Sequence, residues 1–388
     1  MSDTLVKVKD LVQAVVSASE KAACIARACR GEKELFQLLV EEKKECEKNP
    51  RFVQDFKTLA DVLVQETIKH DLGSLFPALK GHIHGEESNK FTNGVGDTVV
   101  VEILSTPQET AALLTQVLNG NASAAQLLSF AAHLDKAVRI DIGTEATIDT
   151  SSLGIWIDPI DSTSEYIAGM WEMEDESGVA TSGLQCVCVL IGAYRLTDGV
   201  PVLGVINQPF RYKRGPETYE GQFYWSISAD DQTVFTSKKL LLPKQPRHRP
   251  VVLASTSESP AVLEALQPDC VVKLAAGAGY KLLCVAQGLV DAYVVSKGTT
   301  FRWDTCAPHA CLRGIGGGVS MLQRAVDNHK RSIQCKDASK VEICYNVAEG
   351  TPDGVLQWCN SLGLIAYRDP RVLEKIVDLL SKGNCCDK

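Results

Sequence analysis

The sequence predicts a two-lobed protein that combines α+β and α/β structure, and three observations lead to this expectation. The chain has 388 residues, enough for two domains at the usual ~100–200 residues each. Amphipathic helices and then strand-like segments fill its first two-thirds, whereas strands and helices alternate singly after residue 250. The polar, proline-containing segment Lys238–Pro250 separates these patterns. We therefore expect an N-terminal α+β lobe over 1–245 and a C-terminal α/β lobe over 246–388.

Helices are predicted in the first lobe where apolar residues recur three and four positions apart. Thr106-Pro107-Gln108-Glu109 is in addition a capping box with proline at the first helical position, so a helix is expected to begin there and stop at Gly120. The other predicted helices are Leu5–Ala26, Glu34–Lys44, Thr58–His70 and Ala124–Leu134.

Strands are predicted where Val, Ile and aromatic residues are enriched and alternate with polar ones. In the first lobe these segments are Leu153–Asp158, Gln185–Tyr194, Val200–Ile206 and Gln222–Ile227. Thr197-Asp198-Gly199 has the composition of a hairpin turn, which indicates antiparallel pairing of the segments on either side. The first lobe is therefore expected to consist of helices packed on a mostly antiparallel sheet.

The second lobe shows a different order, in which short strands and helices follow one another. The predicted strands are Val251–Ala254, Cys270–Leu274 and Val290–Ser296, and the predicted helices are Pro260–Leu266, Tyr280–Ala286 and Asp304–Arg313. This alternation is typical of an α/β unit.

Composition and charge exclude several functional classes. With 45% hydrophobic and 23% charged residues the chain is expected to fold, and no apolar run approaches the ~18 residues of a membrane-spanning helix. The 48 acidic residues exceed the 40 basic ones, and no dense basic face is evident, so nucleic acid is not an expected partner. The start lacks the pattern of a signal peptide, which predicts a cytoplasmic protein whose 14 cysteines stay reduced. Nothing indicates an obligate protein partner.

The segment Trp156-Ile157-Asp158-Pro159-Ile160-Asp161-Ser162-Thr163 carries the most chemical information. An apolar strand is expected to end at Asp158, where Pro159 stops it, and Asp161-Ser162-Thr163 is typical of a helix start. Two carboxylates spaced in this way can hold a hard cation such as Mg²⁺, and the free N–H groups of a helix start suit a phosphate. Taken alone, however, the pattern is also that of an ordinary cap after a strand.

Three further acidic segments extend this pattern. Gly85-Glu86-Glu87 places two carboxylates after a flexible residue, and we expect one of them to face the site, although an exposed acidic loop would look the same. Asp304 stands at a predicted helix start and could equally be a simple cap. Asp61 is a charged residue among apolar ones, which costs stability unless it is paired or belongs to a site.

Together, these segments resemble the lithium-sensitive, Mg²⁺-dependent phosphomonoesterase superfamily, which includes inositol monophosphatase, fructose 1,6-bisphosphatase and bisphosphate nucleotidase. Its signatures are an Asp in an N-terminal helix, Glu-Glu after Gly, Asp-Pro-Ile/Leu-Asp-Gly/Ser-Thr, and Trp-Asp with Ala three residues on, and all occur here in order. The resemblance implies a layered α/β sandwich of the inositol monophosphatase and fructose 1,6-bisphosphatase type.

The resemblance also implies site residues and cofactors. Glu86, Asp158 and the backbone carbonyl of Ile160 would hold one Mg²⁺, and Asp158, Asp161 and Asp304 would hold a second. Thr163 and Asp61 would orient the attacking water, so Asp61 is counted with both the metal site and the catalytic pair. Glu87 would support this region or a weaker third Mg²⁺. Li⁺ is the expected inhibitor.

Substrate contacts are expected from both lobes. In the first lobe the resemblance implies Asp161-Ser162-Thr163, whose helix N-terminus would stabilise the phosphate. In the second lobe it implies Ser257, Gly277, Ala278, Lys281 and Thr299. A glycine-rich turn that enters a helix exposes N–H groups, and Lys281 adds a point charge for a second phosphate. One departure is Ser259, which stands where the family tends to carry a Lys, so the relative preference for bisphosphate and trisphosphate substrates stays open.

Within the superfamily, the flanking stretches are most similar to phosphatases that remove the 1-phosphate from inositol polyphosphates. These stretches are Phe56–Gln65, Gly154–Ser164, Gly183–Gly192, Gly199–Phe210, Gly277–Lys281 and Gly363–Arg368. The expected substrates are inositol 1,4-bisphosphate and inositol 1,3,4-trisphosphate, hydrolysed by direct attack of water. A phosphatase for 3'-phosphoadenosine 5'-phosphate is the alternative, since it shares the string Trp303–Pro308. A non-catalytic inositol phosphate-binding protein ranks lower.

Overall fold

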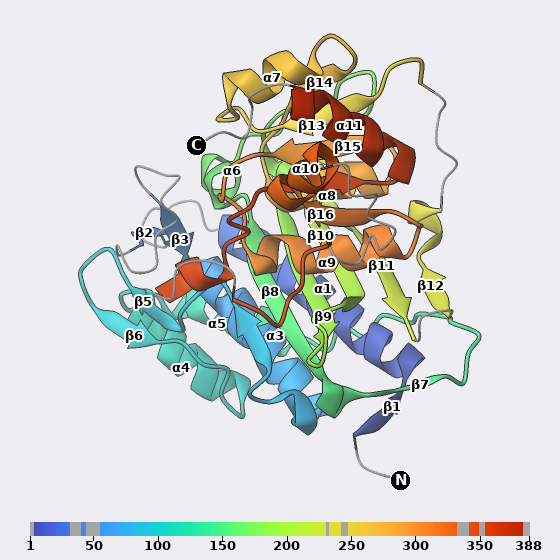
Figure 1. Ribbon diagram of the computed structural model, residues 1–388. Coiled ribbons are helices and arrows are strands. Elements are labelled where there is room, and N and C mark those ends of the chain that lie inside the picture. Colours follow the sequence, from blue (N-terminus) through green and yellow to red (C-terminus); the bar gives the residue numbers. More distant parts are fainter. Residues whose placement is uncertain are drawn as a thin grey trace.

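Layers of helix and sheet alternate through the molecule in the order helix, sheet, helix, sheet, helix (Figure 1). The computed structural model describes residues 4–31, 40–43, 55–229, 233–241, 247–331, 341–348 and 354–382. This arrangement confirms the predicted layered α/β sandwich. Among the described residues, no helix is both long and apolar enough to cross a membrane.

The first helical layer covers one face of a six-stranded sheet. Helices α1 (Val8–Gly31) and α3 (Leu59–Leu75) contact each other and the sheet. Along α1 the buried residues recur with helical spacing, from Val8, Leu11 and Val12 to Cys29. Helices α4 (Pro107–Val117) and α5 (Ala122–His133) pack against one another, and α5 also contacts α1. Burial of these apolar faces holds the layer on the sheet.

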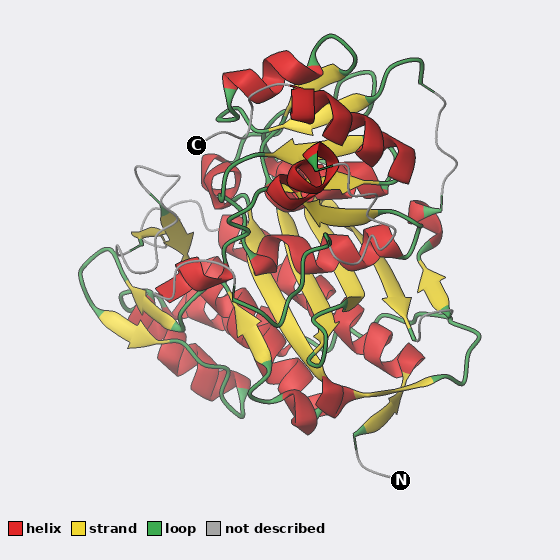
Figure 2. Cartoon of the chain, in the orientation of Figure 1, coloured by secondary structure: helices red, strands yellow, loops and turns green. Residues whose placement is uncertain are grey.

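The six-stranded sheet has the order β12-β11-β10-β9-β8-β4 (Figure 2). Its strands are β4 (Ile83–Gly85), β8 (Leu153–Asp161), β9 (Cys188–Arg195), β10 (Pro201–Lys213), β11 (Tyr219–Ser228) and β12 (Val234–Thr236). Neighbours pair antiparallel except β4, which runs parallel to β8. The predicted mostly antiparallel sheet is therefore confirmed.

The middle helical layer, α8 (Ala278–Ala286) and α9 (Arg302–Arg313), lies between the two sheets. Helix α9 contacts β8, β9, β10 and β11. The approach is close because Gly192 of β9 and Gly204 of β10, which face each other in register, leave no side chain between the sheet and the backbone of Cys306 and Ala307. This close packing sets the height of the N-terminus of α9 above the sheet.

The second sheet has the order β14-β13-β15-β17-β16. Its strands are β13 (Val251–Ala254), β14 (Val271–Leu274), β15 (Ala292–Val295), β16 (Gly318–Met321) and β17 (Leu364–Tyr367). β13 runs parallel to β14 and β15, and β17 runs antiparallel to β15 and β16. The outer layer consists of α7 (Pro260–Leu266), α10 (Leu322–Lys330) and α11 (Pro370–Lys382).

Short elements complete the fold. The strand pairs are β1 (Leu5–Lys7) with β7 (Thr147–Asp149), β2 (Val40–Glu42) with β3 (Phe56–Thr58), and β5 (Lys90–Thr92) with β6 (Thr98–Val100). The short helices are α6 (Thr163–Ala168) and the 3₁₀ segments Pro77–Leu79, Thr150–Ser152, Leu184–Cys186, Lys238–Leu240 and Gly354–Trp358.

Four local predictions are wrong. Leu5–Lys7 forms a strand instead of the first helical turn, because it pairs with β7. Val40–Glu42 pairs with β3, so that part of the predicted helix 34–44 is a strand, and 34–39 and 44 lie outside the described residues. Pro159 does not stop β8, which continues to Asp161. Gln185 and Cys186 belong to a 3₁₀ segment instead of β9.

Predicted elements of the second lobe agree with the structure to within two residues at each end. Helix α9 nevertheless packs on the first sheet, so the two halves share a hydrophobic core. The boundary between residues 245 and 246 stays a prediction.

We predict that Gly204→Ala lowers the free energy of unfolding by about 1–3 kcal/mol, because the added Cβ would collide with the backbone carbonyl of Ala307. Denaturant unfolding of both proteins measures the difference. Gly143→Ala is the matched control, since its Cβ would meet no atom within 4 Å, and we expect a change within about 0.5 kcal/mol. Equal losses in the two variants would contradict the packing argument.

Candidate metal and phosphate site

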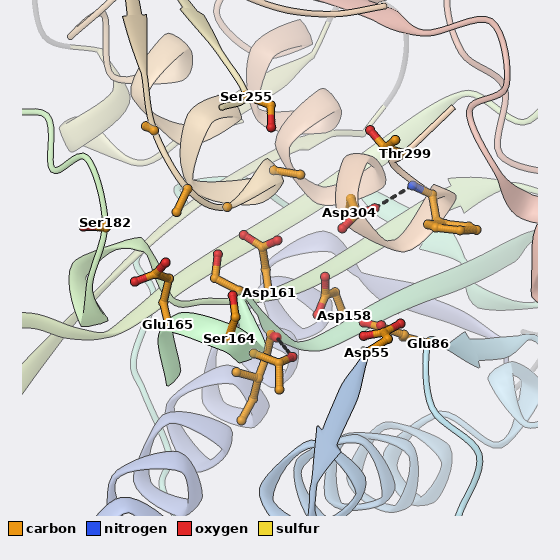
Figure 3. Close-up of a pocket in the computed structure, with 18 of the residues that line it drawn as sticks. Asp55, Glu86, Asp158, Asp161, Ser164, Glu165, Ser182, Ser255, Thr299 and Asp304 are labelled. Carbon is orange, nitrogen blue, oxygen red and sulfur yellow. Dashed lines mark hydrogen bonds between the residues drawn. The ribbon is translucent and has the colours of Figure 1, made fainter. Parts of the chain in front are cut away.

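A cavity of about 350 Å³ opens where the C-terminal end of β8 meets the N-termini of α6, α8 and α9. Figure 3 shows Asp158, Asp161 and Asp304 pointing into it, with Glu86 and Asp55 beside Asp158 and with Ser255 and Thr299 on the side of the second sheet. Its acidic lining residues are Asp55, Glu86, Asp158, Asp161, Glu165 and Asp304. The structure thus brings together residues that are more than 200 positions apart in the sequence.

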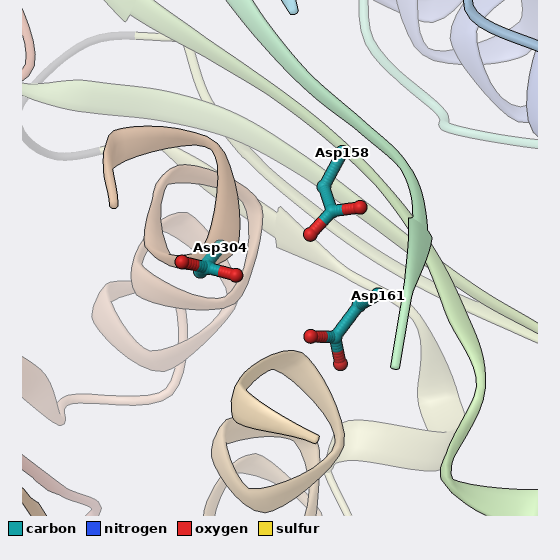
Figure 4. A group of neighbouring side chains, drawn as sticks. All are labelled: Asp158, Asp161 and Asp304. Atoms are coloured by element: carbon teal, nitrogen blue, oxygen red, sulfur yellow. The ribbon is translucent and has the colours of Figure 1, made fainter. Parts of the chain in front are cut away.

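Three carboxylates form the centre of this cavity. Asp158 and Asp161 come from β8, and Asp304 comes from the first turn of α9 (Figure 4). One oxygen from each lies within 4.8 Å of the other two. Asp158 is 1% exposed, and its Oδ1 is buried without a hydrogen-bond partner among the described residues. Such a cluster of oxygen ligands is a suitable site for a divalent cation.

A bulge in β8 explains why both of its aspartates face the cavity. On a regular strand, residues three apart point to opposite sides of the sheet. Asp158 pairs with Leu190 and Asp161 pairs with Cys188, so three steps along β8 correspond to two along β9. The extra residue in β8 shifts the alternation of its side chains by one position. Both carboxylates then lie on the same side of the sheet.

Burial and mutual repulsion together raise the pKa values of the three carboxyl groups. Burial, followed by the charges of Glu86, Asp161 and Asp304, raises the pKa of Asp158 well above its usual value. Burial and then Asp161 and Glu86 do the same for the pKa of Asp304. The pKa of Asp161 rises to about 6, mainly through burial, although the Lys281 ammonium acts in the opposite direction. A bound cation would offset the repulsion among the three carboxylates and keep them ionised.

The backbone after Asp161 has an unusual conformation. Ser162 has φ = 72° and ψ = 48°, a left-handed geometry that non-glycine residues rarely adopt. Gly277 packs against it so closely that a Cβ there would lie 2.5 Å from Ser162 Oγ. The strained turn allows the chain to pass from β8 into the six-residue helix α6, and strain of this kind is typical of functional sites.

Thr163 and Asp61 are brought together as predicted. Thr163 lines the cavity, and its Oγ1 lies 3.4 Å from Asp61 Oδ1 and 3.1 Å from the carbonyl oxygen of Ile160. Asp61 is 1% exposed and caps α3, where its Oδ2 accepts hydrogen bonds from Thr58 N and Thr58 Oγ1 at 2.7 and 2.6 Å. Asp61 therefore contacts the lining residue Thr163 but does not itself line the cavity.

Glu86 reaches the cavity because β4 runs parallel to β8. Gly85 pairs with Ile157, and Glu86 N donates to the Ile157 carbonyl at 3.1 Å, which places Glu86 beside Asp158. Glu87 is buried and does not line the cavity. One of the two glutamates thus faces the site, as expected.

Lys43 is a neighbour of these glutamates that the sequence did not reveal. Its Nζ lies 2.5 Å from Glu86 Oε1 and 2.7 Å from Glu87 Oε1. Burial alone would lower the pKa of Lys43, but the two carboxylates outweigh it and raise this pKa well above its usual value. Lys43 lies in a run of charged residues that resembles an exposed face, so its burial could not be inferred from the pattern.

Of the predicted substrate contacts in the second lobe, three line the cavity and Ser257 lies at its edge. Gly277, Ala278 and Thr299 line the cavity. Ser257 is exposed at its edge, next to the lining residue Thr256. The N-terminus of α8 is partly used within the protein, because Tyr280 N donates to Asp161 Oδ2 at 3.3 Å.

The prediction for Lys281 requires a correction. Lys281 is 2% exposed and does not line the cavity. Its Nζ donates to the Ala275 carbonyl at 3.0 Å and lies 5.0 Å from the centre of the Tyr293 ring. The helical turn that begins at Gly277 directs this side chain into the core, where its charge acts on Asp161 instead of reaching a substrate phosphate.

Several lining residues were not predicted at all. Asp55, Glu165, Thr181 and Ser182 contribute polar groups from loops and from α6. Glu165 follows the Asp161-Ser162-Thr163 motif by two positions, so its closeness in sequence was an available signal. The other three carry no recognisable spacing.

Comparisons with known proteins agree with this geometry. The model of the inositol monophosphatase family matches residues 10–349. Human inositol polyphosphate 1-phosphatase is 44% identical over 96% of this chain and 97% of its own length. Human 3'(2'),5'-bisphosphate nucleotidase 1 is 29% identical over 50% of this chain and 58% of its own length. The predicted resemblance to a 1-phosphatase of inositol polyphosphates, and to the phosphomonoesterase class of enzyme, is confirmed.

A solved structure supports the fold. The extragenic suppressor protein suhB from Bartonella henselae superimposes with a TM-score of 0.53 at 14% identity, over 96% of this chain and 99% of that one. The matched family model covers the carboxylate cluster on β8 and α9 together with Glu86 and the Thr163–Asp61 pair. From the sequence match and the arrangement of these residues, the chain belongs to the inositol monophosphatase family.

Proposed function

We propose that this protein is a Mg²⁺-dependent, lithium-inhibited phosphomonoesterase that removes the 1-phosphate from inositol 1,4-bisphosphate and inositol 1,3,4-trisphosphate. The observation that carries the proposal is the convergence of Asp158, Asp161 and Asp304 in one cavity, with an unpartnered buried oxygen on Asp158. The substrate class rests on the 44% identity to human inositol polyphosphate 1-phosphatase.

The residues present fit divalent cations. Glu86, Asp158 and the carbonyl of Ile160 would hold one Mg²⁺, and Asp158, Asp161 and Asp304 would hold a second. Glu87, which is buried outside the cavity lining, would support this region or a weaker third Mg²⁺. Bound Mg²⁺ would supply the positive charge that balances the phosphoryl group and makes a water more acidic. The orphaned Asp158 Oδ1 supports this assignment, because a buried carboxylate oxygen without a donor is costly unless a cation is bound.

The chain's own residues orient the attacking water. The Thr163 hydroxyl has one proton, and Asp61 Oδ1 and the Ile160 carbonyl both stand within reach as acceptors. Its oxygen therefore keeps lone pairs that can accept a hydrogen bond from water in the cavity. Because Thr58 holds the other oxygen of Asp61, the carboxylate cannot turn away, and Asp61 serves as a positioning residue for Thr163.

The phosphate would be bound by donors around Ser162, Gly277 and Ala278. Ser162 Oγ is buried without a partner among the described residues, and Gly277 lies directly against it at the turn into α8. In-line attack of water then needs no phosphorylated enzyme, since the catalytic groups orient water and stabilise charge.

The first prediction concerns the product. With Mg²⁺, we expect the protein to convert inositol 1,4-bisphosphate into inositol 4-phosphate, which chromatography of the reaction mixture identifies. A panel that includes inositol 1,3,4-trisphosphate and 3'-phosphoadenosine 5'-phosphate tests the alternatives. A strong preference for the nucleotide would favour a bisphosphate nucleotidase, and binding without turnover would favour a non-catalytic protein.

Asp158→Asn should fold but lose at least 90% of its turnover, a barrier increase of about 1.4 kcal/mol or more, because Asp158 would serve both cation sites. A second readout is thermal stability. Wild-type Tm should rise with added Mg²⁺, and this rise should disappear in the variant. Asp135→Asn, an exposed residue outside the cavity, is the control and should behave like wild type. Unchanged Mg²⁺ stabilisation in Asp158→Asn would refute the ligand assignment.

Lithium provides an independent test. We expect millimolar Li⁺ to inhibit hydrolysis uncompetitively with respect to the inositol phosphate, whereas equal Na⁺ should have little effect. Initial rates over a matrix of substrate and Li⁺ concentrations measure this pattern. Competition between Li⁺ and substrate, or activity that Li⁺ leaves intact, would be inconsistent with the proposal.

A further inference from the structure

The described lining of the cavity lacks the positive charge that a polyphosphorylated substrate requires. None of its described lining residues is Lys or Arg, whereas six are acidic. Cations at the Asp158 cluster would balance the phosphate that reacts. A second phosphate on the inositol ring would still need a cationic partner at the edge of the cavity, since an anion is repelled by an uncompensated acidic surface.

Lys297 is placed at this edge. It lies in the loop between β15 and α9, two residues before the lining residue Thr299, whose N–H donates to the Lys297 carbonyl at 2.8 Å. Its exposed side chain crosses to the loop between β13 and α7, where Nζ donates to the Ser257 carbonyl at 2.8 Å. That loop also supplies the lining residues Ser255 and Thr256.

The ammonium group of Lys297 has capacity for a ligand. A lysine Nζ carries three donors, and within the described residues its recorded acceptor is the Ser257 carbonyl. Two N–H groups can therefore donate to phosphate oxygens while the third keeps the side chain in place. No carboxylate of the described chain pairs with it.

A buried carboxylate fixes the backbone from which Lys297 extends. Glu258 is 6% exposed, and it accepts hydrogen bonds from Ser296 N at 3.0 Å, from Ser259 N at 2.7 Å and from Ser296 Oγ. These bonds join the two loops directly before Lys297 and directly after Ser257. The position of the ammonium group is thus set before a ligand binds, which reduces the entropy lost on binding.

Two other lysines near this region, within the described part of the chain, have partners elsewhere. Lys43 is held between Glu86 and Glu87. Lys281 is buried over the Tyr293 ring and bonded to the Ala275 carbonyl. None of the three lysines lines the cavity, but Lys43 and Lys281 are buried whereas Lys297 is exposed. Of these three described lysines, Lys297 is therefore the one that can meet a phosphate at the edge of the cavity.

We infer that Lys297 is a specificity-determining residue that binds a phosphate of the substrate other than the one hydrolysed. The inference rests on the proposed function for the identity of the substrate. It also explains how substrates with more than one phosphate can be bound although residue 259 is serine and Lys281 is buried.

The test compares wild type with Lys297→Ala, Lys297→Arg and the control Lys330→Ala, an exposed lysine on α10. For inositol 1,4-bisphosphate with Mg²⁺, we expect Lys297→Ala to raise KM about tenfold, with kcat within about twofold. The affinity of Lys297→Ala for inositol 4-phosphate, measured by calorimetry, should fall to a similar degree, because this ligand keeps the phosphate that is not hydrolysed. Inhibition by inorganic phosphate should not change. Lys297→Arg should restore most of the affinity, because it keeps the charge.

The outcomes separate this inference from the proposed function. Weaker binding of inositol 4-phosphate in Lys297→Ala, with inorganic phosphate unaffected, supports the role of Lys297 even if turnover is absent. Unchanged binding of inositol 4-phosphate, or an equal loss for both ligands, overturns it. Wild-type protein that binds inositol 4-phosphate but releases no phosphate from any inositol phosphate would overturn the proposed function alone.

Discussion

Repulsion among the carboxylates of Asp158, Asp161 and Asp304 is the constraint on which the rest of the structure depends. Three negative groups within 4.8 Å of one another are unfavourable in a buried site unless protons or cations neutralise them. Packing of separate elements therefore has to hold the three groups close together. A bound cation would offset part of the unfavourable energy of their repulsion. Burial first, and this repulsion second, raise the pKa values of Asp158 and Asp304.

The supports are found in the packing around the cavity. The bulge in β8 turns both of its aspartates to one side, and the glycines of β9 and β10 let α9 approach until Asp304 stands opposite them. Asp304 is held in turn by the backbone N–H of Phe301, which donates to Oδ2 at 2.5 Å. These contacts fix the positions of Asp158 and Asp161 on β8 and of Asp304 on α9. The geometry of the site therefore depends on the packing of the middle helical layer.

The acidic cluster and the loops that carry Ser257 and Lys297 are distinct parts of the structure. Asp158, Asp161, Asp304 and Thr163 line the cavity, whereas Ser257 and Lys297 are exposed in loops that also supply the lining residues Ser255, Thr256 and Thr299. Glu258 joins those loops through hydrogen bonds with Ser296 and Ser259. Under the proposed function, substitutions in these loops would change which inositol phosphates bind while leaving the acidic cluster in place.

Local signals in the sequence determined most of the elements and the acidic motifs. The capping box at Thr106 is read from neighbouring residues, and the structure places it as expected. The two aspartates of the segment from Asp158 to Thr163 are read in the same way, although β8 continues past Pro159 to Asp161. Tertiary structure alone decided the strand at Val40–Glu42, which requires β3 as a partner, and the burial of Lys43 and Lys281. The physical reason is that pairing of distant strands and desolvation of a charge depend on which segments meet in space, and residue spacing along the chain does not contain that information.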